Sequence, residues 1–200
     1  VKVLKEFLEL GWVEESVSEF RTKNDIEPVL RKEQAIVVND IAAELNQFNT
    51  WLLHGITGSG KTEVYMRLVA LQLLQGRQTL VLIPEISLTP QLEKVFRARF
   101  PTTPIISLHS GLNASERAKV WLQALHGTAK IILGTRLSVF TPISDLGLVI
   151  VDEEQDSSFK QQSGLCYSAR DLAIFRAKYT NVPVILGSAT PSLESYHNAI

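Results

Sequence analysis

The sequence is poor in cysteine. Cys166 is the only cysteine among 200 residues, which excludes an internal disulfide and is typical of proteins in a reducing compartment. No second cysteine and no nearby pair of histidines gives Cys166 the spacing of a metal site. We therefore interpret it as a small loop residue.

The chain also lacks a strong net charge and a long apolar run. Its 20 basic and 21 acidic residues give a net charge of −1, so nucleic-acid binding, if present, must be local. No apolar run approaches the roughly 18 residues that span a membrane, and the N-terminus has no signal-peptide pattern. We expect a soluble, cytosolic protein without a membrane partner.

A start methionine is missing, and the chain ends in ESYHNAI without a stop signal, so we expect a fragment of a longer protein. With 45% hydrophobic and 20% charged residues, it has enough apolar material for a full core. Residues 1–25 hold one helical pattern that is too short to fold alone, which indicates a linker or the end of a preceding domain. Residues 26–200 are predicted to form one large domain.

Apolar runs of strand length alternate with helical stretches from Leu30 onward. The predicted strands are residues 51–54, 79–83, 104–108, 130–133, 146–151 and 182–186. The predicted helices are 62–75, closed by Gly76, 89–100, before Pro101, and 114–126, closed by Gly127. Continuous apolar strands between helices predict an α/β fold with a doubly wound, mostly parallel sheet covered on both faces.

The stretch HGITGSGKTE, residues 54–63, fits the phosphate-loop pattern G-x-x-x-x-G-K-[ST] from Gly55 to Thr62. Its glycines allow backbone N–H groups to turn inward around phosphate oxygens. Lys61 would reach the β- and γ-phosphates, and the Thr62 hydroxyl would ligate Mg²⁺ at the positive end of the next helix. The alternative is a glycine-rich turn that binds nothing, but the strand before it and the helix after it favour a site for ATP and Mg²⁺.

Acidic residues follow the strand in LVIVDEEQD. Ligands of a doubly wound sheet gather beyond the carboxyl ends of its strands, so Asp152 is placed to hold Mg²⁺ through its water shell. Glu153 could orient and polarise the attacking water. The alternative is an ordinary acidic helix start.

These motifs carry a family resemblance. GITGSGKTE, DEEQ and GSATPS, at 187–192, resemble motifs I, II and III of the superfamily 2 helicases. LIPEISLTPQL, LHSGLNASER, GTRLSVFTP and IVDEEQDSSFKQQSGLCYSARDLAIFRA are similar to the bacterial replication-restart helicases, the primosomal protein N′ family. The similarity runs from about residue 30 to 200 and implies a RecA-like first helicase lobe. Residues 1–25 resemble the end of that family's winged-helix region.

The resemblance implies roles for residues around the nucleotide. Gln34, in LRKEQ, would contact the adenine edge, which a primary amide can do with one donor and one acceptor; simple solvation at a helix start is the alternative. Ser188 and Thr190 would link nucleotide state to the grip on DNA, unless they only cap a tight turn. The residues that would line the triphosphate are Thr57, Gly58, Ser59, Gly60, Lys61 and Thr62.

Residues after the second, third and fourth strands are the implied DNA contacts. Short hydroxyls, backbone N–H groups and one arginine suit a single-stranded backbone, because phosphate contacts position the strand without selecting a sequence. Any one of them could instead be a structural residue at a strand end. The candidates are Pro84, Thr89, Gln91, His109, Ser110, Gly134, Thr135 and Arg136.

The stretch DSSFKQQSGLCYSARD, residues 156–171, resembles the family's aromatic-rich loop. Phe159 and Tyr167, with Lys160 and Arg170 nearby, would stack on bases and transmit DNA occupancy to the catalytic acid; burial as ordinary core is the alternative. Gln155 stands where the family usually has His after D-E-E. Both side chains form hydrogen bonds, so we expect the chemistry to survive, whereas the coupling of ATP to DNA is less certain.

For the whole protein, the resemblance implies an ATP-dependent 3′-to-5′ DNA helicase of the bacterial cytoplasm that acts in replication restart and primosome assembly. Its implied partners are single-stranded and forked DNA, primosome proteins and single-strand-binding proteins. A second lobe with an arginine finger and the family's paired-cysteine zinc sites are expected beyond residue 200. The 200-residue segment is therefore expected to hold no zinc site and to be nearly inactive alone.

Three alternatives stay open. One is a branch-migrating or restriction-type motor of superfamily 2, against which DEEQDSSFKQQ and GSATPSLES argue. Another is a small-molecule P-loop kinase, which needs an acceptor pocket and an arginine-bearing lid that the sequence does not reveal. The third is a nucleotide-gated binding module without turnover.

Overall fold

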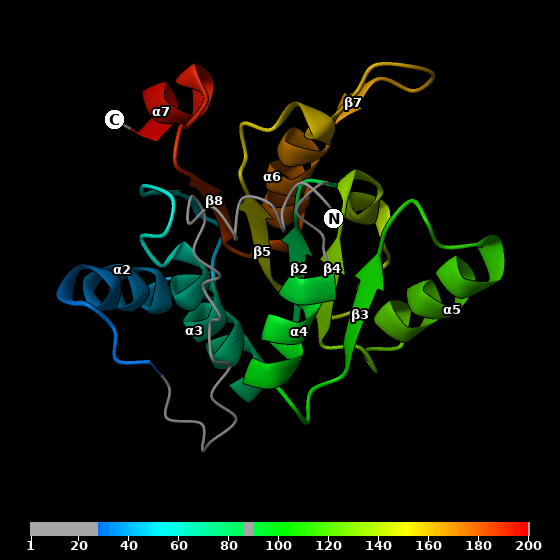
Figure 1. The fold of residues 1–200 in the computed structure, drawn as a ribbon, viewed down its shortest axis with the longest axis horizontal. Coiled ribbons are helices and arrows are strands. Elements are labelled where there is room, and N and C mark those ends of the chain that lie inside the picture. Colours follow the sequence, from blue (N-terminus) through cyan, green and yellow to red (C-terminus); the bar gives the residue numbers. More distant parts are fainter. Residues whose placement is uncertain (1–27, 86–89, 200) are drawn as a thin grey trace, which may run out of the picture.

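A six-stranded parallel sheet forms the centre of the computed structural model, which describes residues 28–85 and 90–199 (Figure 1). Its strand order is β1-β8-β5-β2-β4-β3, and every neighbouring pair is parallel. The strands are β1 (Thr50–His54), β2 (Gln78–Leu82), β3 (Ile105–Leu108), β4 (Ile131–Gly134), β5 (Leu146–Asp152) and β8 (Val184–Ser188). This confirms the predicted α/β fold with a parallel sheet.

Helices cover both faces of the sheet. They are α2 (Lys32–Ala43), α3 (Lys61–Leu74), α4 (Pro90–Arg99), α5 (Ala114–Leu125), α6 (Ala169–Thr180) and α7 (Leu193–Ala199), with the short 3₁₀ helices η1 (Arg136–Phe140) and η2 (Ser157–Phe159). Side chains of α2, α3 and α4 pack in one core cluster, and side chains of α5 and α6 pack in a second. A small antiparallel hairpin of β6 (Lys160–Gln161) and β7 (Tyr167–Ser168) lies between β5 and α6 in the chain.

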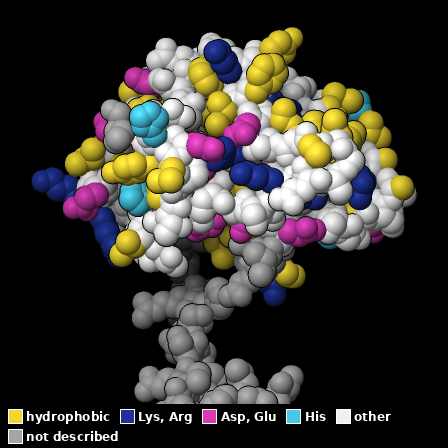
Figure 2. All heavy atoms as spheres, turned by 90° about the horizontal axis from the view of Figure 1, so that it is seen from above, with side chains coloured by type: hydrophobic (Ala, Val, Ile, Leu, Met, Phe, Trp, Pro, Cys, Tyr) yellow, Lys and Arg dark blue, Asp and Glu magenta, His cyan; other side chains and the backbone are white. Residues whose placement is uncertain are grey.

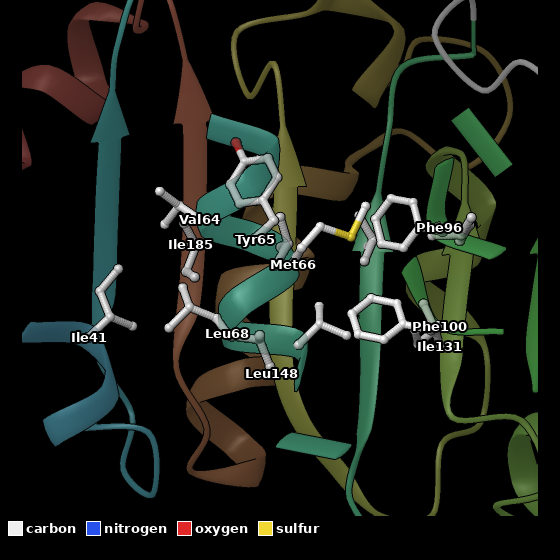
Figure 3. Close-up of a cluster of buried hydrophobic side chains, with 14 of the residues drawn as sticks. Ile41, Val64, Tyr65, Met66, Leu68, Phe96, Phe100, Ile131, Leu148 and Ile185 are labelled. Carbon is white, nitrogen blue, oxygen red and sulfur yellow. The ribbon is translucent and has the colours of Figure 1, made fainter. Parts of the chain in front are cut away.

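Strand β5 shows why the apolar runs in the sequence are continuous. Its residues Leu148 and Ile150 belong to the first core cluster, whereas Val149 and Val151 belong to the second. Because successive side chains of a strand point to opposite faces, both faces of a central strand must be apolar. Figure 3 shows the first cluster, where Tyr65, Met66 and Leu68 of α3 lie against the sheet.

All six predicted strands and the three predicted helices are present, with ends within two residues of the prediction. Gly76 and Gly127 have φ angles of 74° and 68°, a left-handed conformation that favours glycine, and follow the ends of α3 and α5 as predicted. Residues 1–25, with the resemblance to a winged-helix region, lie outside the described residues. None of the described helices is both long and apolar enough to cross a membrane.

The carboxyl ends of all six strands point to one edge of the sheet, which is the upper side in Figure 1 and faces the viewer in Figure 2. Here the chain leaves each strand into the loops that carry the sequence motifs. Parallel topology therefore gathers these motifs on one side of the molecule, although they are far apart in sequence.

Candidate active site

The phosphate-loop segment connects β1 to α3 at this edge. Gly58 and Gly60 have φ angles of 77° and 87°, which glycine adopts at low cost. A side chain at Gly60 would also collide with the amide of Gln34. The ammonium of Lys61 donates a hydrogen bond to the carbonyl oxygen of Gly55 at 2.7 Å, so it bridges the two ends of the loop. Thr57 and Thr62 are exposed beside it.

Gln34 lies against this loop. Its amide nitrogen donates to the carbonyl oxygens of Ser59, at 3.1 Å, and Gly60, at 3.4 Å, and its amide oxygen accepts from the backbone N–H of Arg31 at 2.9 Å. The structure thus brings Gln34 to the phosphate loop from a separate helix. Its contact with adenine stays a prediction, because the side-chain amide of Gln34 forms its hydrogen bonds with the backbone of Arg31, Ser59 and Gly60.

Asp152 is the last residue of β5 and is held by the phosphate-loop helix. The hydroxyl of Tyr65, from α3, donates to one carboxylate oxygen of Asp152 at 2.9 Å. Gly187 makes room for this bond, because any side chain there would collide with the Tyr65 hydroxyl. Burial raises the pKa of Asp152, while the Tyr65 hydrogen bond and the charge of Lys61 oppose that rise.

A chain of hydrogen bonds links Glu153 to motif III. The amide nitrogen of Gln155 donates to Glu153 at 3.0 Å, and the Ser188 hydroxyl donates to the amide oxygen of Gln155 at 2.5 Å. The backbone N–H of Thr190 then donates to the Ser188 hydroxyl at 2.9 Å. Glu153 itself has a φ of 48°, a left-handed conformation that costs energy in a residue other than glycine. Gln155 thus bonds in both directions, as expected for the residue in the usual place of His.

Glu154 has a different environment, which the sequence did not predict. Its side chain is fully buried and accepts hydrogen bonds from four donors. These donors are the guanidinium of Arg170, the backbone N–H and hydroxyl of Ser192, and the hydroxyl of Ser195. The third acid of DEEQ, Glu154, therefore connects motif II to the region that follows motif III. The only sign of this role in the sequence is that a second glutamate follows Glu153 directly.

Arg170 is an ion-pairing residue rather than a free cation near the aromatic residues. It bonds to Glu154 at 3.1 Å, Asp171 at 2.8 Å and Glu194 at 2.9 Å. Burial alone lowers the pKa of Arg170, but the hydrogen bonds to these carboxylates outweigh that effect and raise it. The Arg170 guanidinium is thus already paired with three carboxylates of the protein.

The predicted stacking role of Phe159 is wrong. Phe159, the last residue of η2, is 1% exposed and belongs to the second core cluster. Tyr167 is partly exposed and packs edge-on against Phe140 with ring centroids 5.1 Å apart. Of the two aromatics of the predicted loop, Tyr167 is therefore the one accessible enough to contact a base.

The implied DNA contacts fall into several environments. Arg136 donates to the carbonyl oxygens of Ser158, at 3.1 Å, and Lys160, at 3.2 Å, so it ties η1 to the segment after motif II. His109 is exposed, whereas Thr135 is buried at the end of β4. Thr89 lies outside the described residues, and nothing is described of the Gln91 side chain.

The Mg²⁺ ligands predicted from sequence fit the donor set at this edge. Among the described residues, no group of three or more His, Cys, Asp or Glu side chains could cage a metal ion. Mg²⁺ in nucleotide sites is instead held by one or two carboxylates with substrate phosphates and water. The Asp152 carboxylate, which the Tyr65 hydroxyl orients, and the exposed hydroxyl of Thr62 suit that mode.

The parallel sheet, the phosphate loop between β1 and α3, and the acid at the end of β5 define a RecA-like P-loop nucleotide-binding domain. The model of the DEAD/DEAH box helicase family matches residues 31–199, and the chain belongs to this family. Membership in this family implies that the chain uses a nucleotide.

Curated relatives indicate a narrower group within this family. The chain is 49% identical over 169 residues to replication restart protein PriA of Haemophilus influenzae, which covers 84% of this chain. It is 53% identical over 154 residues to PriA of Synechocystis sp., which covers 76% of this chain. The chain spans 23% and 18% of the length of these two relatives. The resemblance found in the sequence motifs is confirmed.

Solved structures show the same fold. RecG bound to a three-way DNA junction matches with a TM-score of 0.63 and 22% identity, over 99% of this chain and 24% of RecG. The Hef helicase domain of Pyrococcus furiosus matches with a TM-score of 0.58 and 22% identity, over 86% of this chain and 35% of that one.

Proposed function

We propose that the chain forms the ATP-binding first lobe of an ATP-dependent 3′-to-5′ DNA helicase that acts in replication restart and primosome assembly. The observation that carries this proposal is the hydrogen-bonded path from Glu153 through Gln155 and Ser188 to Thr190. A site that only binds a nucleotide needs no such chain of hydrogen bonds. A motor, in contrast, must connect its catalytic acid to a segment that moves when ATP is hydrolysed. Similarity to PriA proteins supports the biological role.

The phosphate loop binds the nucleotide in this proposal. Backbone N–H groups of residues 57–60 donate to the phosphates, and Lys61 exchanges its bond with Gly55 for one with the β- and γ-phosphates. Gln34, whose amide contacts the loop, would orient adenine. When bound, Mg²⁺ neutralises the charge that develops on the transferred phosphoryl group. Thr62 and Asp152 would hold it, and Tyr65 keeps Asp152 in one orientation.

Glu153 is the proposed general base. It would accept a hydrogen bond from the attacking water and orient the water's oxygen toward the γ-phosphorus. The bond from Gln155 fixes one of its carboxylate oxygens, which leaves the other oxygen for water. The Ser188 hydroxyl holds the other end of the Gln155 amide. A shift of Ser188 would therefore move the amide that bonds Glu153, and motif III would in this way control the position of the base.

Single-stranded DNA would lie along the carboxyl edge of the sheet. Exposed His109 and partly buried Arg136 follow neighbouring strands β3 and β4 and would contact successive phosphates, with buried Thr135 between them in the chain at the end of β4. Forked DNA, primosome proteins and single-strand-binding proteins are proposed partners of the whole protein in the bacterial cytoplasm. Residues 1–25 are proposed to end a winged-helix region or to form a linker, and the zinc sites of the family are proposed to lie outside this chain.

The test uses the intact protein with forked duplexes that carry a single-stranded arm of either polarity. We expect ATP-dependent unwinding with movement from 3′ to 5′ along the arm, and turnover stimulated by single-stranded DNA. Lys61→Ala should abolish nucleotide binding in calorimetry and unwinding with it. Lys178→Ala removes an exposed cation from the last turn of α6 and serves as the matched control.

The possible outcomes separate the alternatives. Nucleotide binding without any turnover would favour a nucleotide-gated binding module. Turnover stimulated by duplex but not by single-stranded DNA would favour another motor of the same superfamily. Unchanged nucleotide affinity in Lys61→Ala would refute the assignment of the phosphate loop.

A further inference from the structure

An apolar pocket of about 390 Å³ opens beside the carboxyl ends of β3 and β4. Its wall includes His109, Arg117, Trp121, Thr135, Phe140 and Leu165, and we call it the β3–β4 pocket. Figure 2 shows hydrophobic side chains gathered on the right of the carboxyl edge, the side on which α5 and β3 lie in Figure 1. The nucleotide site uses none of these residues.

The rings that line the β3–β4 pocket are accessible. Trp121 is 37% exposed and Phe140 is 45% exposed, although both are large apolar side chains at the surface. Tyr167 packs edge-on against Phe140 and supports its ring from beside the pocket. Contiguous exposed apolar surface of this kind usually marks a binding site.

The charged groups of the pocket indicate what binds there. Arg117 and His109 are its basic lining residues, and its described lining contains no carboxylate. A ligand that combines a flat apolar group with a negative charge matches this wall, because the rings can stack on the flat group while the cation contacts the charge. A nucleotide unit of single-stranded DNA has both.

We propose that the β3–β4 pocket takes a base of single-stranded DNA, which contacts the rings of both Trp121 and Phe140. This inference rests on the proposed function, since His109 and Thr135 belong both to the pocket and to the predicted backbone contacts. A strand that contacts His109 at the end of β3 has its bases within reach of the pocket. Stacking is tolerant of sequence because every base has a π-face.

The pocket also touches the segment after motif II. Leu165, in the turn of the β6–β7 hairpin, forms part of its wall. Arg136 ties the start of that hairpin to η1, whose residue Phe140 forms another part. An inserted base would therefore contact both the hairpin and η1, close to the segment that carries Glu153 and Gln155.

The experiment compares oligodeoxythymidylate with an abasic oligomer of the same length, which keeps the phosphates and lacks the bases. We expect the intact wild-type protein to bind the base-bearing strand more tightly. Trp121→Ala and Phe140→Leu should each weaken binding of that strand by roughly 5- to 150-fold, the range for loss of one stacked base. Neither variant should change affinity for the abasic oligomer.

Controls keep the result interpretable. Leu122→Ala removes an exposed apolar side chain from the same helix, outside the pocket, and should leave both affinities unchanged. Phe140→Leu keeps an apolar side chain, so it still tests the proposal if Trp121→Ala does not fold. Thermal melting shows whether each variant is folded. The inference is overturned if the wild type binds the two oligomers equally tightly, or if both variants keep the wild-type ratio of the two affinities. Either result would favour a polypeptide as the ligand of the pocket. Failure of the wild type to bind either oligomer would instead contradict the proposed function.

Discussion

Removal of the Arg170 guanidinium should destabilise the fold by about 3 kcal/mol, the lower end of the cost of breaking a buried ion pair. The Arg170 side chain is 11% exposed, and its partner Glu154 is fully buried. Arg170→Ala leaves the Glu154 carboxylate in the interior without a cation. Bonds from Ser192 and Ser195 remain, which is why we expect the lower end of the range.

The other two ion pairs of Arg170 contribute little to this value. Asp171 and Glu194 are 59% and 72% exposed, and exposed pairs add roughly 0 to 1 kcal/mol each. Asp171→Ala is therefore the matched control, with an expected loss of about 0.5 kcal/mol or less. Urea denaturation of both variants measures the free energy of unfolding.

A double-mutant cycle isolates the buried pair. In a Glu154→Gln background there is no buried charge to leave unpaired, so Arg170→Ala should cost at least about 1.5 kcal/mol less than in the wild type. An Arg170→Ala variant as stable as Asp171→Ala would refute the reasoning. Equal costs of Arg170→Ala in both backgrounds would show that its stabilisation does not act through Glu154.

Two further predictions test groups around the site. Tyr65→Phe removes the hydroxyl that positions Asp152 and should raise the Mg²⁺ concentration needed for half-maximal nucleotide binding, while binding without Mg²⁺ stays unchanged; equal changes in both would indicate a packing role. Glu93 accepts hydrogen bonds from Ser107 and Arg97, and although burial opposes them, these bonds lower the pKa of Glu93. The ionised Glu93 therefore stabilises the fold above the ordinary glutamate pKa, and this stabilisation is lost as the pH falls through the lower folded-state pKa. In a plot of melting temperature against pH, Glu93→Gln should flatten the fall at acid pH. An unchanged fall at acid pH would contradict this.

Much of the sheet could be predicted from sequence, and the reason is physical. A strand such as β5 is buried on both faces, so its residues form an uninterrupted apolar run between turn signals. The phosphate loop has fixed spacing because only glycine permits its curvature. The positions of motif residues at the carboxyl edge follow from parallel topology alone.

The contacts of individual side chains could not be predicted in the same way. Phe159 and Tyr167 both follow motif II, but Phe159 in η2 is buried whereas Tyr167 in β7 is partly exposed, and no local pattern encodes that difference. The Glu154 cluster joins residues 16 to 41 positions apart, and its donors are ordinary serines and one arginine. Tyr65 looks like a core residue of α3, and its bond to Asp152 depends on the missing side chain of Gly187.

The central claim, that Glu153 activates water at a site coupled to motif III, is tested most directly by phosphate release from Glu153→Gln in the intact protein. The amide is nearly isosteric but cannot take a proton, so ATP affinity should stay near the wild-type value. Turnover should fall at least about 100-fold, the lower range for loss of a general base, with and without single-stranded DNA. Asp145→Asn, a change to an exposed acid just before the same strand at the opposite edge, should have no effect. Near-normal turnover in Glu153→Gln would contradict the account.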